Sequence, residues 1–173
     1  MYRIGYYFAK LMTKLKHSQE PINNYYRKAG VRIGTDCLIC SPSILTREPF
    51  LIEIGNNVTI STNVTFVTHD NSAKLVFAPE GGNLFGKIKI GNDCFIGSNS
   101  VLMYGVELGN HIIVAAGAVV TKSFREERVI IGGNPAKVIS TWDRYYDKSY
   151  GRNIHRKDLP ERISKDTSFL ITR

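Results

Sequence analysis

The sequence predicts an all-β fold in which short strands wind into a parallel β-helix, with helices at both ends. Three observations predict it: large apolar side chains recur every six residues, glycine often follows them directly, and small or β-branched residues stand four positions after them. The chain has 173 residues, of which 43% are hydrophobic and 22% charged. This composition suits one globular domain with its own core.

The period of six runs through the middle of the chain. The large apolar residues are Ile33, Ile39, Leu45, Ile54, Ile60, Phe66, Ile90, Ile96, Leu102, Leu108, Val114 and Val120. Glycine follows at Gly34, Gly55, Gly91, Gly97 and Gly109. The small or β-branched set is Cys37, Ser43, Val58, Val64, Cys94, Ser100, Val106, Ile112 and Ala118. An α-helix needs a period of 3.6 and a half-buried strand a period of 2, so neither fits.

A coil of three short strands explains the pattern, because each flat face of a triangular prism takes one large inward side chain and each corner a small one. Glycine is expected at the corners because it tolerates positive φ. Coils of about eighteen residues stack roughly 4.8 Å apart with parallel hydrogen bonding. We therefore expect a β-helix over residues 31–139.

Two interruptions break the period. Three extra residues stand between Leu45 and Ile54, and the pattern disappears between Phe66 and Ile90. The second stretch contains Pro79 and Gly81-Gly82, which favour turns. We expect residues 70–86 to form a loop that protrudes from a corner of the prism, and loops of this length are often functional.

Both ends are expected to be helical. The apolar stripe of the first helix is Ile4, Phe8, Leu11 and Leu15. We expect residues 1–30 to cap the open end of the prism through this stripe, and a helix lying on a membrane surface is the alternative. Residues 140–173 are expected to form a short helix near Trp142 and then a mobile tail over 151–173.

The net charge of +8 is unevenly distributed. Residues 1–32 hold seven basic and one acidic side chain, residues 33–121 four and seven, and residues 122–173 twelve and seven. The acidic middle argues against nucleic-acid binding, while the basic ends suit a phosphate-bearing cofactor, an anionic glycan or a membrane face. No apolar run reaches the roughly 20 residues of a membrane span, and no secretion signal is recognisable, so a cytoplasmic location is expected.

The three cysteines, Cys37, Cys40 and Cys94, are an odd number and imply no disulfide framework. A redox or zinc role for the Cys37–Cys40 pair would need further ligands or a thioredoxin-like context, which the sequence lacks. We expect the cysteines to fill the core as small side chains.

The repeats, the Thr-His-Asp sequence at 68–70 and the Gly-Asn-Pro-Ala-Lys sequence at 133–137 resemble the hexapeptide-repeat acyltransferases over about residues 28–146. That family includes galactoside and maltose acetyltransferases and the O-acetyltransferases of capsule and lipopolysaccharide synthesis. The resemblance implies a left-handed β-helix, a homotrimer, acetyl-CoA as the donor, a carbohydrate acceptor and no metal. Aspartate after the histidine, where the galactoside and maltose branch resembles His-Pro, favours the polysaccharide branch.

The resemblance identifies His69 as the general base, since acyl transfer to a hydroxyl needs a proton acceptor near neutral pH. The other histidines, His17, His111 and His155, lie in the N-terminal segment, on an ordinary corner and in the tail. Three residues are candidates for binding the acceptor or orienting His69, and these are Asp70, Ser41 and Glu48. Asp70 can equally be a turn residue.

Counting along the coils predicts where acetyl-CoA binds. Ser98 and Ala116 are eighteen residues apart and stack on one corner, whereas His69 shares another corner with Gly105 and Ser123. A threefold trimer can bring these two corners together between neighbouring subunits. The resemblance implies that the pantetheine arm contacts Gly97, Ser98 and Ala116. It also implies that Thr121, Lys122 and Lys137 lie near the adenosine phosphates.

Other functions share the same repeats. The acceptor could be an amino sugar or an antibiotic instead of a sugar hydroxyl. A γ-class carbonic anhydrase would need three histidines at one metal, and only His69 and His111 lie on coils. A non-catalytic β-helix scaffold would not need the Thr-His-Asp and Gly-Asn-Pro-Ala-Lys sequences.

Overall fold

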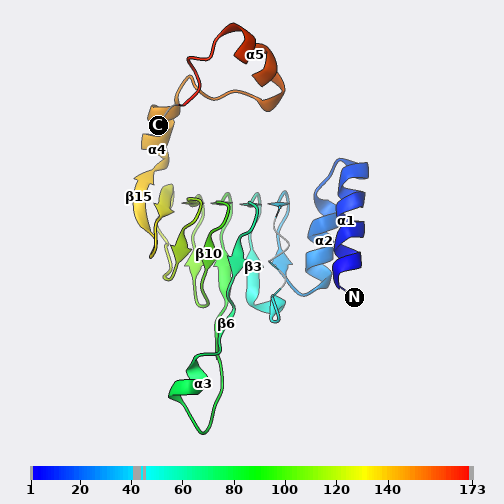
Figure 1. Ribbon diagram of the computed structural model, residues 1–173, viewed down its shortest axis with the longest axis vertical. Coiled ribbons are helices and arrows are strands. Elements are labelled where there is room, and N and C mark those ends of the chain that lie inside the picture. The colour runs from blue at the N-terminus through cyan, green and yellow to red at the C-terminus, as the bar shows by residue number, and fades with distance from the viewer. Residues whose placement is uncertain (1, 41–43, 45, 172–173) are drawn as a thin grey trace.

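A computed structural model describes residues 2–40, 44 and 46–171. A prism of stacked coils forms the middle of the molecule, with helices at both ends and a hairpin that projects from one corner (Figure 1). The parallel β-helix and its terminal helices thus agree with the architecture expected from the sequence.

Three sheets form the faces of the prism. The first contains β1 (Arg32–Ile33), β3 (Ile52–Ile54), β8 (Ile88–Ile90) and β11 (Glu107–Leu108). The second contains β2 (Leu38–Ile39), β4 (Thr59–Ile60), β9 (Phe95–Ile96), β12 (Ile113–Val114), β14 (Val129–Gly132) and β15 (Lys137–Thr141). The third contains β5 (Thr65–Phe66), β10 (Val101–Leu102) and β13 (Val119–Val120). Pairing is parallel except between β14 and β15, and equivalent residues of successive coils align, as in Ile54↔Ile90.

The core is the stack of residues with the period of six. Eleven of the twelve large apolar residues are buried, from Ile33 to Val120, and the twelfth, Leu45, lies outside the described residues. Ile44, the residue before it, is fully buried. The extra residues that follow form the short 3-10 helix η2 (Pro49–Leu51).

The expected reason for the repeated glycines was wrong. Gly34, Gly55 and Gly91 do not have positive φ; instead they allow successive coils to approach closely. A Cβ atom added to Gly91 would lie 2.6 Å from the carbonyl oxygen of Gly109. The left-handed corner positions are taken mostly by Asp, Asn and His, the residues that tolerate this conformation best after glycine, such as Asp93 and His111.

Cys37 and Cys94 are buried in the core as expected, but Cys40 is exposed. The Sγ of Cys94 donates to the carbonyl oxygen of Gly109 at 3.2 Å. Burial raises the pKa of the Cys94 thiol to about 11, so this thiol stays protonated and unreactive at neutral pH.

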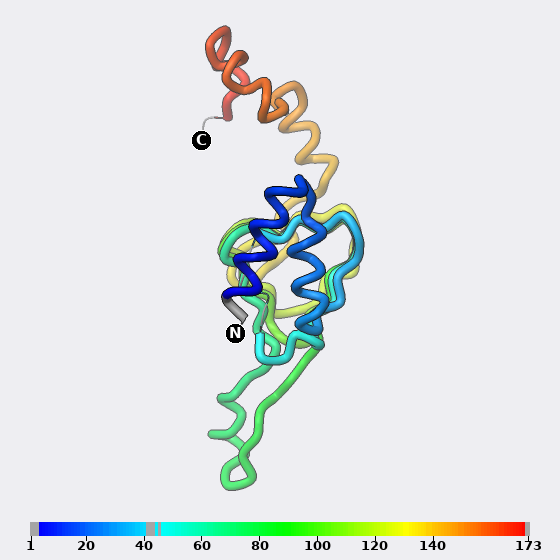
Figure 2. The backbone as a smooth tube through the Cα atoms, turned by 90° about the vertical axis from the view of Figure 1, so that its right-hand side faces the viewer, coloured from blue at the N-terminus to red at the C-terminus, as the bar shows by residue number. Residues whose placement is uncertain are grey.

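The N-terminal cap differs from the expected one. It consists of two helices, α1 (Tyr2–Lys16) and α2 (Glu20–Lys28), and α2 covers the prism with Ile22 and Tyr26, both buried. α1 packs against α2 and lies farther from the coils in Figure 1, and the two helices lie side by side in Figure 2. The apolar stripe predicted to pack on the prism is exposed instead, because α1 uses its other face to contact α2.

The segment between β5 and β8 forms an antiparallel hairpin. β6 (His69–Asp70) pairs antiparallel with β7 (Leu84–Phe85), and α3 (Ala73–Val76) lies near the tip. The hairpin projects away from the prism at the corner between the third and first sheets (Figures 1 and 2). The predicted loop over residues 70–86 corresponds to it.

The C-terminal segment holds more structure than the single helix and mobile tail expected. β15 folds back on β14, and α4 (Trp142–Ser149) begins directly after it with Thr141 as its N-cap. The 3-10 helix η3 (Arg156–Asp158) and α5 (Leu159–Lys165) follow within the stretch predicted to be a tail. None of the described helices has both the length and the apolar character needed to cross a bilayer.

Candidate functional site

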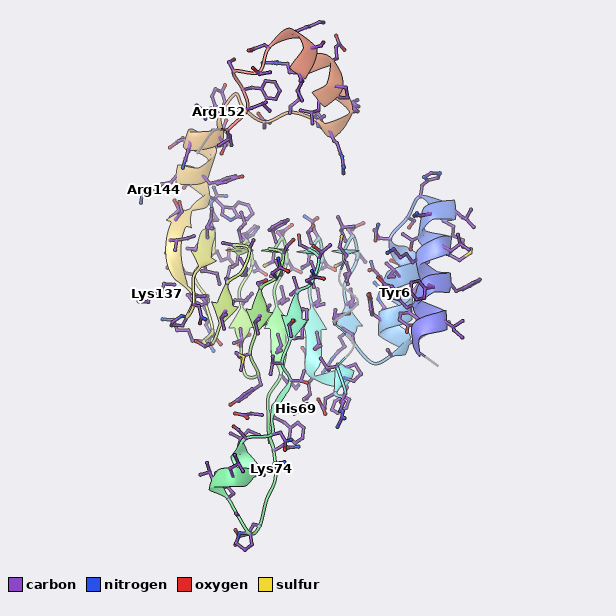
Figure 3. The ribbon with its side chains drawn as sticks, viewed as in Figure 1. Tyr6, His69, Lys74, Lys137, Arg144 and Arg152 are labelled. Atoms are coloured by element: carbon purple, nitrogen blue, oxygen red, sulfur yellow. The ribbon has the colours of Figure 1, made fainter. Side chains whose placement is uncertain are left out.

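His69 lies where the chain leaves the prism to enter the hairpin (Figure 3). Its ring stands 5.9 Å from the ring of Phe85 across the antiparallel pair, centroid to centroid. About a third of its side chain, 33%, remains accessible. The ring is therefore held by the hairpin and still open to a reactant.

Glu48 is the hydrogen-bond partner of His69. Its Oε2 atom lies 3.0 Å from Nδ1 of His69, and the same oxygen accepts a bond from the Thr68 hydroxyl at 2.7 Å. The Thr68 hydrogen bond and the contact with His69 lower the pKa of the Glu48 carboxyl. An ionised carboxylate can only accept, so Nδ1 is the donor in this contact, and a neutral imidazole held in this way has its lone pair on Nε2.

Nε2 of His69 has no hydrogen-bond partner among residues 2–40, 44 and 46–171. Glu48 is 17% exposed and Thr68 only 2%, so the pair that holds the imidazole is shielded while the other ring nitrogen is not. Chemically, this arrangement can accept a proton at Nε2 while Glu48 holds the other ring nitrogen.

Asp70 forms its hydrogen bonds with residues other than His69. It accepts from the backbone N–H of Ser72 at 2.8 Å and from the Ser72 hydroxyl at 2.6 Å, and the Tyr104 hydroxyl donates to it at 3.2 Å. The Ser72 hydroxyl is the main cause that lowers the pKa of the Asp70 carboxyl. These bonds fix the turn of the hairpin and tie it to the next coil. The hydrogen-bond partner of His69 is thus Glu48 rather than Asp70.

Ser98 and Ala116 stack on one corner of the prism, between the second and third sheets, as the spacing predicted. The N–H of Gly117 donates to the carbonyl oxygen of Ser98 at 2.9 Å, and Thr62 on the coil before donates to the Ser98 hydroxyl at 3.2 Å. Gly97 is buried, and a Cβ atom added there would lie 2.5 Å from the nitrogen of Ala116. The side chains along this corner are small.

The backbone of this corner offers free donors. Within the part of the chain that the structure describes, no acceptor is found for the N–H of Ser98 or of Ala116. The pantetheine arm of coenzyme A is a thin chain with two amide groups, so a small-residue edge with unpaired N–H donors fits it. This corner is not the one that holds His69, again as predicted.

Thr121, Lys122 and Lys137 are exposed near the last coils. The N–H of Ala136 donates to the carbonyl oxygen of Val119 at 2.8 Å, which brings the segment of Lys137 beside the end of β13 and therefore near Thr121. Figure 3 shows Lys137 toward the end of the prism opposite α1. Ser41 lies outside the described residues.

Thr68 and Phe85 were not anticipated as site residues. A signal for Thr68 was available, because it is a hydroxyl residue two positions after the inward-facing Phe66 and so falls on the inner side of a strand. No signal pointed to Phe85, whose position beside His69 depends on the pairing of the hairpin.

His111 lies on another corner, 3.5 Å from a carboxylate oxygen of Asp93 and 3.3 Å from one of Glu127. Among the described residues, no group of three or more His, Cys, Asp or Glu side chains is arranged to hold a metal ion.

A prism of stacked six-residue repeats, with a histidine where the chain leaves one corner, is typical of the hexapeptide-repeat transferases. A family model described as a hexapeptide repeat of succinyl-transferase matches residues 30–66 and 87–122. The gap between the two matches coincides with the hairpin.

The chain is 46% identical over 156 residues to Protein CapG of Staphylococcus aureus, covering 88% of this chain and 87% of that protein. It is 32% identical over 107 residues to the galactoside O-acetyltransferase of Escherichia coli, covering 60% of this chain and 52% of that protein. The chain belongs to the hexapeptide-repeat acyltransferase family, and it is an acyltransferase.

A solved structure supports the fold. The hexapeptide-repeat containing acetyltransferase of Vibrio cholerae, complexed with acetyl coenzyme A, matches with a TM-score of 0.54 at 20% identity. The match covers 81% of this chain and 86% of that chain. At this identity the likeness concerns the fold alone.

Proposed function

We propose that this acyltransferase moves the acetyl group of acetyl-CoA to a hydroxyl of a carbohydrate acceptor, and that it does so as a homotrimer of left-handed β-helices. The observation that carries the proposal is the hydrogen bond of 3.0 Å between Glu48 and Nδ1 of His69, which leaves Nε2 as the proton acceptor. Acetyl-CoA as donor is supported by the small-residue corner at Ser98 and Ala116 and by the acetyl coenzyme A complex of the Vibrio cholerae relative.

In the proposed reaction, Nε2 of His69 takes the proton of the acceptor hydroxyl as its oxygen attacks the thioester carbonyl. The tetrahedral intermediate collapses and the carbon–sulfur bond breaks. The coenzyme A sulfur then receives the proton that His69 took from the acceptor. The products are the acetyl ester and free coenzyme A. Glu48 keeps Nδ1 protonated and stabilises the imidazolium while the proton resides on the ring.

The proposed site lies between subunits. In one chain His69 follows the third sheet, whereas Ser98 and Ala116 lie at the corner between the second and third sheets. In a ring of three parallel prisms, the His69 corner of one subunit faces the Ser98–Ala116 corner of the next. The backbone N–H groups of Ser98 and Ala116 then hold the pantetheine arm, and Thr121, Lys122 and Lys137 hold the phosphates.

For the acceptor, we propose a sugar of a surface polysaccharide, acetylated in the cytoplasm. The His-Asp sequence at residues 69–70 and the similarity to the galactoside O-acetyltransferase support a sugar hydroxyl. A screen of sugar acceptors that detects the free thiol of released coenzyme A tests this directly.

The role of His69 is tested by the variant His69→Ala. Turnover should fall by about a hundredfold to ten-thousandfold, as the loss of a general base does. Acetyl-CoA affinity, measured by calorimetry, should stay within about twofold, because the donor edge is on another corner. His155→Ala is the matched control, since His155 is an exposed histidine outside the prism, and it should keep full turnover. Wild-type turnover in His69→Ala would contradict the proposed mechanism.

A further inference from the structure

The outer face of α1 is the largest feature of the fold that acyl transfer leaves unexplained. Five large apolar side chains lie exposed there: Ile4 (80% exposed), Tyr7 (65%), Phe8 (64%), Leu11 (53%) and Leu15 (65%). Their spacing places them on one stripe of the helix. We call this set the α1 stripe.

The α1 stripe points away from the protein because the opposite side of α1 is already used. A Cβ atom added to Gly5 would lie 2.9 Å from the Tyr25 ring, the Tyr6 and Tyr25 ring centroids are 6.2 Å apart, and Ala9 is buried. Figure 1 shows α1 as the outermost element at its end of the prism, and Figure 2 shows it in front of the coils when that end faces the viewer. The stripe is thus the end surface of the molecule.

The charges of α1 are all positive. The described helix contains Arg3, Lys10, Lys14 and Lys16, and the first acidic residue of the chain is Glu20. Lys10, Lys14 and Lys16 are exposed, and none of them forms an ion pair with any residue that the structure describes. By helical spacing, Lys10 and Lys14 lie along one edge of the α1 stripe and Lys16 beyond its other edge.

We infer that the α1 stripe docks on an anionic membrane surface, with its apolar side chains among the lipid acyl chains and its lysines at the headgroup phosphates. A helix with an apolar face, a basic flank and no acid is the type that lies in the plane of a lipid interface. Lysine stems extend along the apolar surface while their ammonium groups reach the phosphates. A second copy of the chain is a poorer occupant, since its identical face would bring the lysines together.

Assembly strengthens this docking. In the proposed trimer of parallel prisms, on which only this step depends, the three copies of α1 lie at the same end of the assembly. Three weak contacts with one surface then act together, and the combined affinity greatly exceeds that of one helix. The prism axis would stand upright on the membrane.

Vesicle flotation of the full chain tests the inference without any substrate. The probes are vesicles of phosphatidylcholine containing about one third phosphatidylglycerol, and vesicles of phosphatidylcholine alone. The wild type should float with the anionic vesicles and bind the neutral ones at least about tenfold more weakly. Raising the salt concentration should release the protein, because the lysine contribution is screened.

The deciding variant is Phe8→Glu with Leu11→Glu, which places two charges on the α1 stripe and, at exposed positions, leaves the fold intact. Its binding to the anionic vesicles should fall at least about tenfold. The matched control is Leu75→Glu with Val76→Glu, since these side chains are each 78% exposed and lie in the hairpin. This control should bind as the wild type does.

Three results would overturn the inference. They are no binding of the wild type to anionic vesicles, unchanged binding of the stripe variant, or a mass of the stripe variant that differs from that of the wild type in light scattering without lipid. The last would mean that the stripe is a contact between copies. These results are separate from the proposed function, because acetyl transfer to a water-soluble acceptor should be the same in the stripe variant and the wild type. An inactive wild type that binds vesicles would instead leave the inference standing and contradict the proposed function.

Discussion

The carboxylate of Glu48 lies between two donors, the Thr68 hydroxyl and the His69 ring. Sequence reasoning selected Glu48 as a candidate because it stands in an insertion, and His69 because a family resemblance implied it. It could not connect them, since residues 48 and 69 meet only when one coil stacks on the next. The same limit applies to Asp70, whose contacts with Ser72 and Tyr104 depend on the shape of the turn.

Replacing Glu48 by Gln should lower turnover by roughly tenfold to a thousandfold, since a neutral amide neither fixes the tautomer nor stabilises the imidazolium. The KM for acetyl-CoA should stay within about twofold, because Glu48 lies at a different corner from the donor edge. This split between kcat and KM distinguishes a positioning residue from general damage to the fold.

The control for that prediction is Glu53→Gln. Glu53 is another glutamate on the prism, and its ion-pair partners are Arg32 at 2.7 Å and Lys87 at 3.4 Å rather than His69. A loss of turnover equal in the two variants would contradict the role of Glu48.

The pKa of Glu48 predicts a pH dependence of stability. A carboxyl whose folded pKa is lowered stabilises the fold fully above its unfolded value, about 4.3, and this contribution disappears as the pH falls through the lowered folded pKa. Thr68 is the largest cause, so Thr68→Val should lower the melting temperature by a few degrees at pH 7. The difference from the wild type should shrink steadily as the pH falls below about 5. A difference that does not change with pH would show that Thr68 acts through packing alone.

At the scale of the elements, the period of six located the strands well because each inward position is decided by one side chain and its equivalent on the next coil. Ile54, Ile90 and Leu108 align in this way. The packing of the N-terminal cap was harder to predict from the sequence. The stripe from Ile4 to Leu15 indicates that one face of a helix is apolar, but not which surface covers it, and α2 took the place that the sequence favoured for α1.

The close approach of the coils gives a test of the stacking. Gly91→Ala would put a Cβ atom against the backbone of Gly109, at 2.6 Å from its oxygen, and backbone cannot move aside cheaply. We expect a loss of about 1–3 kcal/mol in the free energy of unfolding, measured with urea. Lys89→Ala, at an exposed position on β8 just before Gly91, should cost less than about 0.5 kcal/mol. Equal losses of unfolding free energy in the two variants would argue against the close approach of Gly91 and Gly109.

At the scale of the whole molecule, the separation of His69 from the corner of Ser98 and Ala116 follows from the order of the faces along the chain. Counting in sixes was enough to predict it, and the stacking of Ser98 beside Ala116 agrees. What the sequence of one chain does not contain is the contact between copies, since that depends on the shapes of two corners that are distant in the sequence. The identity of the acceptor is not predicted by the sequence for the same reason, because in the proposed trimer its binding surface would form between subunits.

The shared site requires a trimer, so light scattering should report about three times the chain mass of 19.4 kDa.

The most direct test of sharing is complementation between two inactive variants. One is His69→Ala, and the other carries Ser98→Trp and Ala116→Trp to block the donor edge. When differently tagged chains are co-expressed in equal amounts and mixed trimers are purified through both tags, some interfaces pair an intact His69 with an intact edge. Every mixed trimer then has one complete site of its three, so acetyl transfer should return to roughly a third of the wild-type rate. If each variant alone is inactive and the mixed trimers are inactive as well, the base and the donor edge act within one chain and the shared site is wrong.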